Sequence, residues 1–133
     1  MLEGLSSALS GLAAATKRLE ASANNIANAN SNGSIPASDA AQQRDAYQPV
    51  RVEQSSAPDG GTTTSNRYVS PPYIPVFDTH SAFANSDGLV AAPNVDIASE
   101  YTEQISALQS VEANLKSVQS ISDLVKKLYD LTE

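Results

Sequence analysis

Apolar residues, with one threonine among them, recur at helical spacing at the start of the chain. Over the first 26 residues they step alternately by three and four positions, which keeps them on one face of an α-helix. This N-terminal row consists of Leu2, Leu5, Leu9, Leu12, Thr16, Leu19, Ala23 and Ile26. The pattern predicts a helix from about Leu2 to Ala27, roughly 40 Å long at 1.5 Å per residue.

A second row with a coarser 3-3-4 step occupies the end of the chain. It consists of Ile105, Leu108, Val111, Leu115, Val118, Ile121, Val125, Leu128 and Leu131. The Asp96 carboxylate is placed to cap the start of a helix here, and Lys126 and Lys127 suit the dipole at its end. We expect a helix of about 35 residues, much longer than the ordinary helix of about 11–12 residues and typical of an assembly element.

The residues that flank the first row are small, which favours close packing against more than one neighbour. They are Ala8, Ala13, Ala15, Ser22 and Ala27, and the asparagine-rich run from Asn24 to Gly33 is suited to end the helix. An ordinary two-helix bundle is the alternative, but bundles have short connections, unlike residues 33–94. We therefore predict a mainly α fold with long N- and C-terminal helices packed as a coiled-coil-like pair, which bury their rows chiefly against other subunits.

The middle of the chain is expected to be extended. All seven prolines lie there, which excludes long helices. Tyr47–Glu53 alternates like a strand, Pro58–Gly61 is a turn signal, and a second strand is expected near Asn66–Val69. The pattern thus divides the chain into an N-terminal assembly helix (1–32), an irregular or β-hairpin region (33–94) and a C-terminal assembly helix (95–133).

Composition limits both the core and the partners. Aromatic residues make up only 5% of the 133 residues, so a self-sufficient core is doubtful and the isolated chain is expected to be incompletely folded. The net charge is −7 and no window is basic, which argues against nucleic acid and anionic membranes. The chain has no cysteine, and its N-terminal segment is too polar for a secretory signal or a membrane span, so we expect no membrane insertion.

The sequence offers little for catalysis. His80 is the one histidine, and it lies near Asp78 without the converging partners that a triad or a metal site needs. Gly60-Gly61 lacks the lysine of a phosphate-binding loop. We predict no enzymatic activity, no catalytic or metal-binding residues and no cofactor; a hydrolase that uses His80 is the weakest alternative.

Two segments carry a resemblance to a known family. Ala23–Gly33, which reads ANNIANANSNG, resembles the N-terminal signature of bacterial flagellar axial proteins of the rod and hook type. Glu112-Ala113-Asn114 with the leucine-rich end is similar to the C-terminal helix of that family. Asn85–Asp96 looks like a segment of its proximal rod proteins, which are short like this chain.

The resemblance implies a structural subunit of the flagellar basal-body proximal rod, the periplasmic shaft that transmits motor torque. Such proteins are exported by the flagellar type III apparatus without a cleaved signal peptide and assemble helically with copies of themselves and other rod proteins. The alternatives are a stand-alone coiled-coil binding or adaptor module, or another axial flagellar protein. The expected assembly interface comprises Leu5, Leu9, Leu12, Leu19, Asn24, Asn25, Ile26, Asn28, Ile105, Leu108, Glu112, Asn114, Leu115, Val118 and Leu128.

Overall fold

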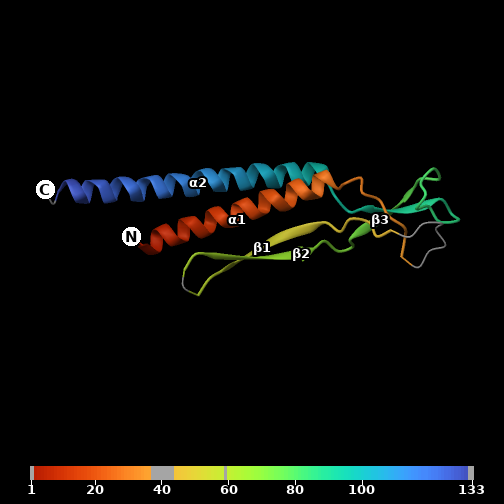
Figure 1. The fold of residues 1–133 in the computed structure, drawn as a ribbon, viewed down its shortest axis with the longest axis horizontal. Helices are drawn as coiled ribbons and strands as arrows, with labels where there is room; N and C mark the ends of the chain where they lie inside the picture. The colour runs from red at the N-terminus through yellow and green to blue at the C-terminus, as the bar shows by residue number, and fades with distance from the viewer. Residues whose placement is uncertain (1, 37–43, 59, 132–133) are drawn as a thin grey trace.

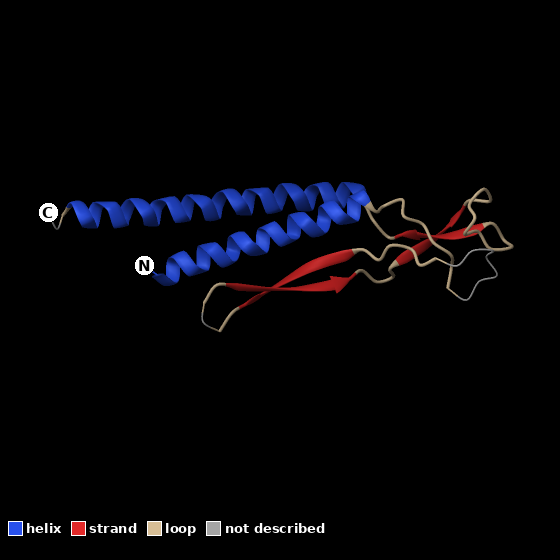
Figure 2. Cartoon of the chain, viewed as in Figure 1, coloured by secondary structure: helices blue, strands red, loops and turns tan. Residues whose placement is uncertain are grey.

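The computed structural model describes residues 2–36, 44–58 and 60–131. It contains helices α1 (Leu2–Ala27) and α2 (Ile97–Asp130) and strands β1 (Val50–Ser56), β2 (Thr62–Tyr68), β3 (Tyr73–Phe77) and β4 (Leu89–Pro93). The molecule is elongated: α1 lies between α2 and the β1–β2 hairpin, both termini are at one end, and β3 and β4 are at the other (Figure 1). About half of the chain is helical (Figure 2), so the predicted terminal helices with a β-containing middle are confirmed.

Both helices begin and end close to the predicted residues. The Asp96 side chain accepts a hydrogen bond from the Ala98 N–H at 3.1 Å and caps α2, which is 34 residues long. At the end of α1 the Asn28 N–H still donates to the Asn24 carbonyl, and beyond it the asparagine-rich run continues as turns. Local capping chemistry was therefore sufficient to place these boundaries.

The helices are antiparallel and meet through small residues. Ala8, Ala15 and Ser22 are buried on α1, and Ala107 is the buried residue of α2. At Gly11 the helices are so close that an added Cβ would lie 2.8 Å from the Asn114 side-chain oxygen. The leucines of the N-terminal row are not the centre of this contact, because larger side chains would hold the two backbones apart.

The C-terminal row divides between two faces of α2. Val111, Val118, Ile121 and Val125 are half-buried, whereas Ile105, Leu108, Leu115, Leu128 and Leu131 are exposed. From Ile105 to Leu131 the row takes eight steps over 26 positions, a mean step shorter than the 3.6 residues of a helical turn. Such a row drifts around the helix, so one part faces α1 and the other faces away.

The predicted hairpin is present, but β1 begins three residues later than expected, and β2 begins four residues earlier. β1 and β2 pair antiparallel from Val50↔Tyr68 to Ser56↔Thr62. Asp59 of the predicted turn lies outside the described residues. Gly61 has φ +86°, and an added Cβ there would lie 2.3 Å from the Ser10 hydroxyl oxygen, so the hairpin tip touches α1.

The second hairpin, formed by β3 and β4, was not predicted. Pro75 lies inside β3 and Pro93 ends β4, and prolines within such runs argue against strands. The Asn94 N–H donates to the Pro72 carbonyl, and the Asp78 N–H donates to the Gly88 carbonyl. In the alternating ladder that these bonds define, the backbone nitrogen of Pro75 faces the free edge of β3, where no donor is needed. On its other side β4 forms an isolated bridge between Ala91 and Gly33.

The apolar core of the described chain is small. Its buried hydrophobic residues are Ala8, Ala14, Ala15, Val90, Ala91 and Ala107. Alanines contribute little apolar area each, so the packing of this chain against itself supplies only a modest part of the free energy needed for stable folding.

Candidate assembly interface

One buried carboxamide joins α1, β1 and α2. The Asn25 oxygen accepts hydrogen bonds from the Val50 N–H and the Tyr47 hydroxyl, both at 3.0 Å. Its NH₂ group donates to the Val50 carbonyl at 2.9 Å and to a Glu100 carboxylate oxygen at 2.8 Å. All four hydrogen-bonding positions of the amide are used, and the two bonds to Val50 pair with the free edge of β1 as a neighbouring strand would.

Ser22 reinforces the same junction one turn earlier in α1. Its buried hydroxyl donates to the Glu100 carbonyl at 3.0 Å, so the backbone and the carboxylate of Glu100 are both held by α1. The beginning of α2 is thereby fixed against the end of α1. The amides and hydroxyls are satisfied inside the chain, which is what burial of polar groups requires.

An ion pair links the helices next to this junction. The Arg18 guanidinium donates to the Glu103 carboxylate and to the Ser106 hydroxyl. The hydrogen bond from Arg18 lowers the pKa of Glu103 below its ordinary value, and the charge of Arg51 adds to this effect. The same bond raises the pKa of Arg18.

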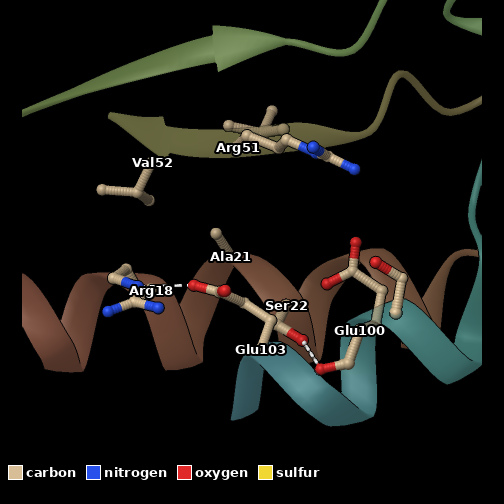
Figure 3. Close-up of a pocket in the computed structure, with 9 residues that line it drawn as sticks. Arg18, Ala21, Ser22, Arg51, Val52, Glu100 and Glu103 are labelled. Carbon is tan, nitrogen blue, oxygen red and sulfur yellow. Dashed lines mark hydrogen bonds and ion pairs between the residues drawn. The ribbon is translucent and has the colours of Figure 1, made fainter. Parts of the chain in front are cut away.

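A small pocket of about 150 Å³ lies between α1, α2 and β1 (Figure 3). Figure 3 shows Arg18 and Glu103 on one side of it, with Arg51 reaching from β1 towards Glu100. Two arginines and two glutamates balance one another here, and Glu103 and Glu100 already bind residues of α1. The pocket is therefore part of the junction and has no excess charge to attract an ionic ligand.

The β1–β2 hairpin is held to α1 at both of its ends. Asn25 binds Val50 at the base, and near the tip the Ser10 hydroxyl accepts from the Thr62 N–H at 3.0 Å. Between these contacts lies a groove of about 590 Å³ with mixed polar and apolar walls that include Lys17, Glu20 and Asn66. The hairpin is thus attached mainly by hydrogen bonds at two points 15 residues apart on α1, about 22 Å along the helix.

The structure places the predicted interface residues in three environments. Leu9, Ile105, Leu108, Leu115 and Leu128 are 45–59% exposed, and Asn24 and Glu112 are also exposed. Leu5, Leu12, Leu19, Ile26, Asn28, Asn114 and Val118 are half-buried. Asn25 is buried and all its bonds lie within the chain, so it organises the subunit itself.

A group of exposed and half-buried leucines from both helices lies on one side of the helix pair. Gly11 faces Asn114, and Leu12 and Leu115 each follow one position later, which turns each by about 100° from the contact. Because the helices are antiparallel, these rotations point to the same side. Leu5 and Leu19 are seven residues from Leu12, and Leu108 is seven residues from Leu115, so they share that side. Leu9, which is 49% exposed, lies one helical turn from both Leu5 and Leu12 and forms the outer edge of this side. We call the set Leu5, Leu9, Leu12, Leu19, Leu108 and Leu115 the leucine face.

The hairpin lies on the opposite side of α1. Ser10, which binds Thr62, precedes Gly11 by one position and is turned the other way by the same angle. Among the described residues of this chain, the hairpin therefore does not cover the leucine face. A row of half-exposed leucines running along both helices marks an interaction surface.

No other site of chemistry emerges from the part of the chain that the structure describes. His80 is exposed, and its backbone N–H donates to the Asp78 carboxylate in a local turn. The described residues contain no group of three metal-ligating side chains. Neither described helix has an apolar stretch long enough to cross a bilayer.

Sequence reasoning did not identify several residues of the junction. Ser10, Arg18, Tyr47 and Glu100 each make a bond between segments, but as isolated residues they look like ordinary surface positions. Ser22 was singled out only as a small residue that favours close packing, not for its hydrogen bond to Glu100. A signal was present on α1, since Arg18, Ser22 and Asn25 follow Ala8, Gly11 and Ala15 at steps of three and four. The small residues and these polar residues together mark the face of α1 that packs against α2.

Comparison with known proteins identifies the family. A family model described as flagella basal body rod protein matches residues 5–33, and one described as flagellar basal body rod FlgEFG protein C-terminal matches residues 86–131. The flagellar basal-body rod protein FlgC of Salmonella typhimurium is 30% identical over 131 residues, covering 92% of this chain and 90% of that protein. The chain belongs to the flagellar basal-body rod protein FlgC family.

Other members of the FlgC family show similar relationships. FlgC of Yersinia enterocolitica is 32% identical over 124 residues and covers 92% of this chain and 90% of its own, and FlgC of Agrobacterium fabrum is 27% identical over 122 residues, with shares of 92% and 88%. The two family-model matches contain α1 from Leu5 onwards with the segment up to Gly33, and β4 with α2. Both sides of the α1–α2 contact and of the Gly33–Ala91 bridge therefore lie in the matched segments.

Proposed function

We propose that this chain is a structural subunit of the flagellar basal-body rod whose leucine face is covered by neighbouring subunits. The observation that carries the proposal is the exposure of leucines from both helices on one side, in a chain that belongs to a rod protein family. Full burial of one leucine side chain contributes about 1.5–3 kcal/mol, so covering the face supplies free energy that the small alanine core lacks.

The partners are other copies of the chain and other rod proteins. The three- and four-residue steps of the N-terminal row suit coiled-coil-like packing of leucines between subunits, while small residues form the contact within one subunit. Head-to-tail contacts of this kind generate an open helical array. An elongated subunit with its helices parallel to its long axis suits a shaft that transmits torque across the periplasm (Figure 1).

The three segments have separate roles in this proposal. Residues 1–32 and 95–133 are the assembly helices, and residues 33–94 carry the two hairpins. The weak internal core suits export of an unfolded chain by the flagellar type III apparatus without a cleaved signal, with folding completed during assembly. The role is structural, without catalysis or a cofactor.

Substitution on the leucine face tests the proposal. Leu115→Asp places a charge where a neighbouring subunit should cover the helix, whereas Ser117→Asp adds the same charge to an exposed position of α2 on the other side. We expect the Leu115 variant to be missing from purified basal bodies and its cells to be non-motile, while the Ser117 variant assembles. Normal incorporation of the Leu115 variant would contradict the proposal.

A further inference from the structure

The family signature ends in Asn32-Gly33, which is the one Asn-Gly pair of the chain. Gly33 is buried and forms a two-bond bridge with β4: its N–H donates to the Ala91 carbonyl and its carbonyl accepts from the Ala91 N–H, both at 2.9 Å. Ala91 is fully buried. The backbone amide of Gly33 is therefore bonded to β4 in a buried part of the molecule, beyond the end of α1.

The other side of Gly33 is closed by the chain that leads into β1. An added Cβ would lie 2.3 Å from the Arg44 carbonyl oxygen and 2.3 Å from the Ala46 nitrogen. The next N–H, that of Ser34, donates to the same Arg44 carbonyl at 2.7 Å. The Gly33 peptide group is thus held between β4 and residues 44–46 and has little freedom to rotate.

The Asn32 side chain is held much less firmly. Asn32 is half-buried, and its carboxamide makes no hydrogen bond to any residue that the structure describes. An asparagine carboxamide next to glycine is an electrophile beside an unhindered backbone nucleophile. In this structure only the nucleophile, the Gly33 nitrogen, is restrained.

We propose that Asn32 is a site of spontaneous deamidation, and that formation of the Gly33–Ala91 bridge blocks the reaction. When the bridge is open, the Gly33 nitrogen loses its proton and bonds to the Asn32 side-chain carbonyl carbon, and ammonia leaves to give a five-membered succinimide. Water then opens the ring to aspartate or isoaspartate, so water is the only co-reactant. In the folded junction the N–H remains bonded to Ala91, and the peptide group cannot turn to form the ring.

The isoaspartate product would prevent the bridge from forming again. Isoaspartate adds one carbon to the backbone path before Gly33, so its N–H and carbonyl no longer match the Ala91 register. Either product adds one negative charge to a chain of net charge −7. A subunit that remains unfolded is thus removed from the supply of competent subunits, while a folded one is preserved.

The test compares two reactions of the same amide in the full chain. Hydrogen exchange of the Gly33 N–H, followed by NMR over a series of urea concentrations, measures how often the bridge opens. Tandem mass spectrometry of the tryptic peptide that contains residues 19–44 measures the gain of about 1 Da at Asn32 in parallel samples. Asn85-Ser86, which has a bulkier following residue, provides an internal comparison.

We expect the deamidation rate at Asn32 to follow the open fraction of the Gly33 amide, with a rise of about 10-fold or more between the closed and the unfolded junction, since two hydrogen bonds must break. In high urea Asn32 should react faster than Asn85. A rate at Asn32 that does not change with Gly33 protection, or that is no faster than Asn85 in urea, would overturn the inference. Neither result depends on whether the chain enters the rod.

Discussion

At the scale of single residues, hydrogen bonds between polar side chains hold the elements together, a role that a large apolar core has in most domains. Asn25 binds β1 and α2 at once, and Ser22 and Arg18 add bonds to α2 in the preceding turns. A buried amide with all of its partners in place fixes geometry, because each partner left alone would be buried without a hydrogen bond. The junction therefore has one well-defined arrangement.

Asn25→Asp should destabilise the chain far more than Asn24→Asp. The first substitution removes the NH₂ group that binds Val50 and Glu100 and puts a carboxylate beside that of Glu100. Each buried group left unsatisfied costs about 1–3 kcal/mol, so we expect a loss of about 2 kcal/mol or more in the free energy of unfolding by urea. The Asn24 side chain is exposed and donates to the Glu20 carbonyl of its own helix, so equal stability of the two variants would contradict this role.

The Arg18–Glu103 pair should make stability depend on acid pH. The pKa of Glu103 is lowered in the folded chain, chiefly by the hydrogen bond from Arg18, from an ordinary value of 4.5. The stabilisation is therefore complete above that value and is lost as the pH falls through the lower folded value. We expect Glu103→Gln to reduce the loss of unfolding free energy that occurs below about pH 4.5. An unchanged acid dependence would show that the pair does not contribute.

At the scale of elements, the arrangement of α1 depends on two rows that have the same period. Ala8, Ala15 and Ser22 repeat every seven residues, as do Leu5, Leu12 and Leu19. Sequence alone predicted the helix, its bounds and the leucine row as an interaction face. It did not indicate that the small row faces α2, because that choice depends on how closely the two backbones approach.

The hairpins also show that local sequence signals predict an element only when its contacts do not depend on the rest of the fold. β1 and β2 carry an alternating pattern and a glycine turn, so they were predicted from local signals. β3 and β4 contain Pro75 and Pro93, which are acceptable only because the hydrogen-bond alternation turns Pro75 to a free edge. The Asn25 network could not be predicted either, since Tyr47, Val50 and Glu100 meet Asn25 only in the folded chain.

Contact of the hairpin tip with α1 can be isolated with two glycines. Gly60 and Gly61 both have φ +86°, so alanine suffers the same backbone strain at either position. A Cβ at Gly60 meets no atom within 4 Å, whereas one at Gly61 would meet Ser10. Hydrogen exchange of the Thr62 amide, which donates to Ser10, should accelerate more in Gly61→Ala than in Gly60→Ala. Equal acceleration would mean that the tip is not held to α1.

At the scale of the whole molecule, the described chain buries few apolar residues and leaves many large ones exposed. The contact between its helices consists of small and polar residues of α1 against small and half-buried aliphatic residues of α2. Exposed leucines of both helices, Leu9, Leu108 and Leu115, lie on the side that the hairpin leaves open. The free energy gained within one subunit is limited, and the gain from covering the leucine face is available only in the assembly. Folding and assembly are therefore expected to support each other.

The absence of cysteine from the natural sequence allows the leucine face to be probed directly. Single Leu9→Cys and Leu115→Cys variants would be treated with a maleimide in the free chain, in purified basal bodies and in basal bodies dissolved in denaturant. The account predicts rapid labelling of both cysteines in the free chain and in denaturant, and strong protection in intact basal bodies, because neighbouring subunits cover both positions. Equally rapid labelling in intact basal bodies that contain the variants would contradict the central claim.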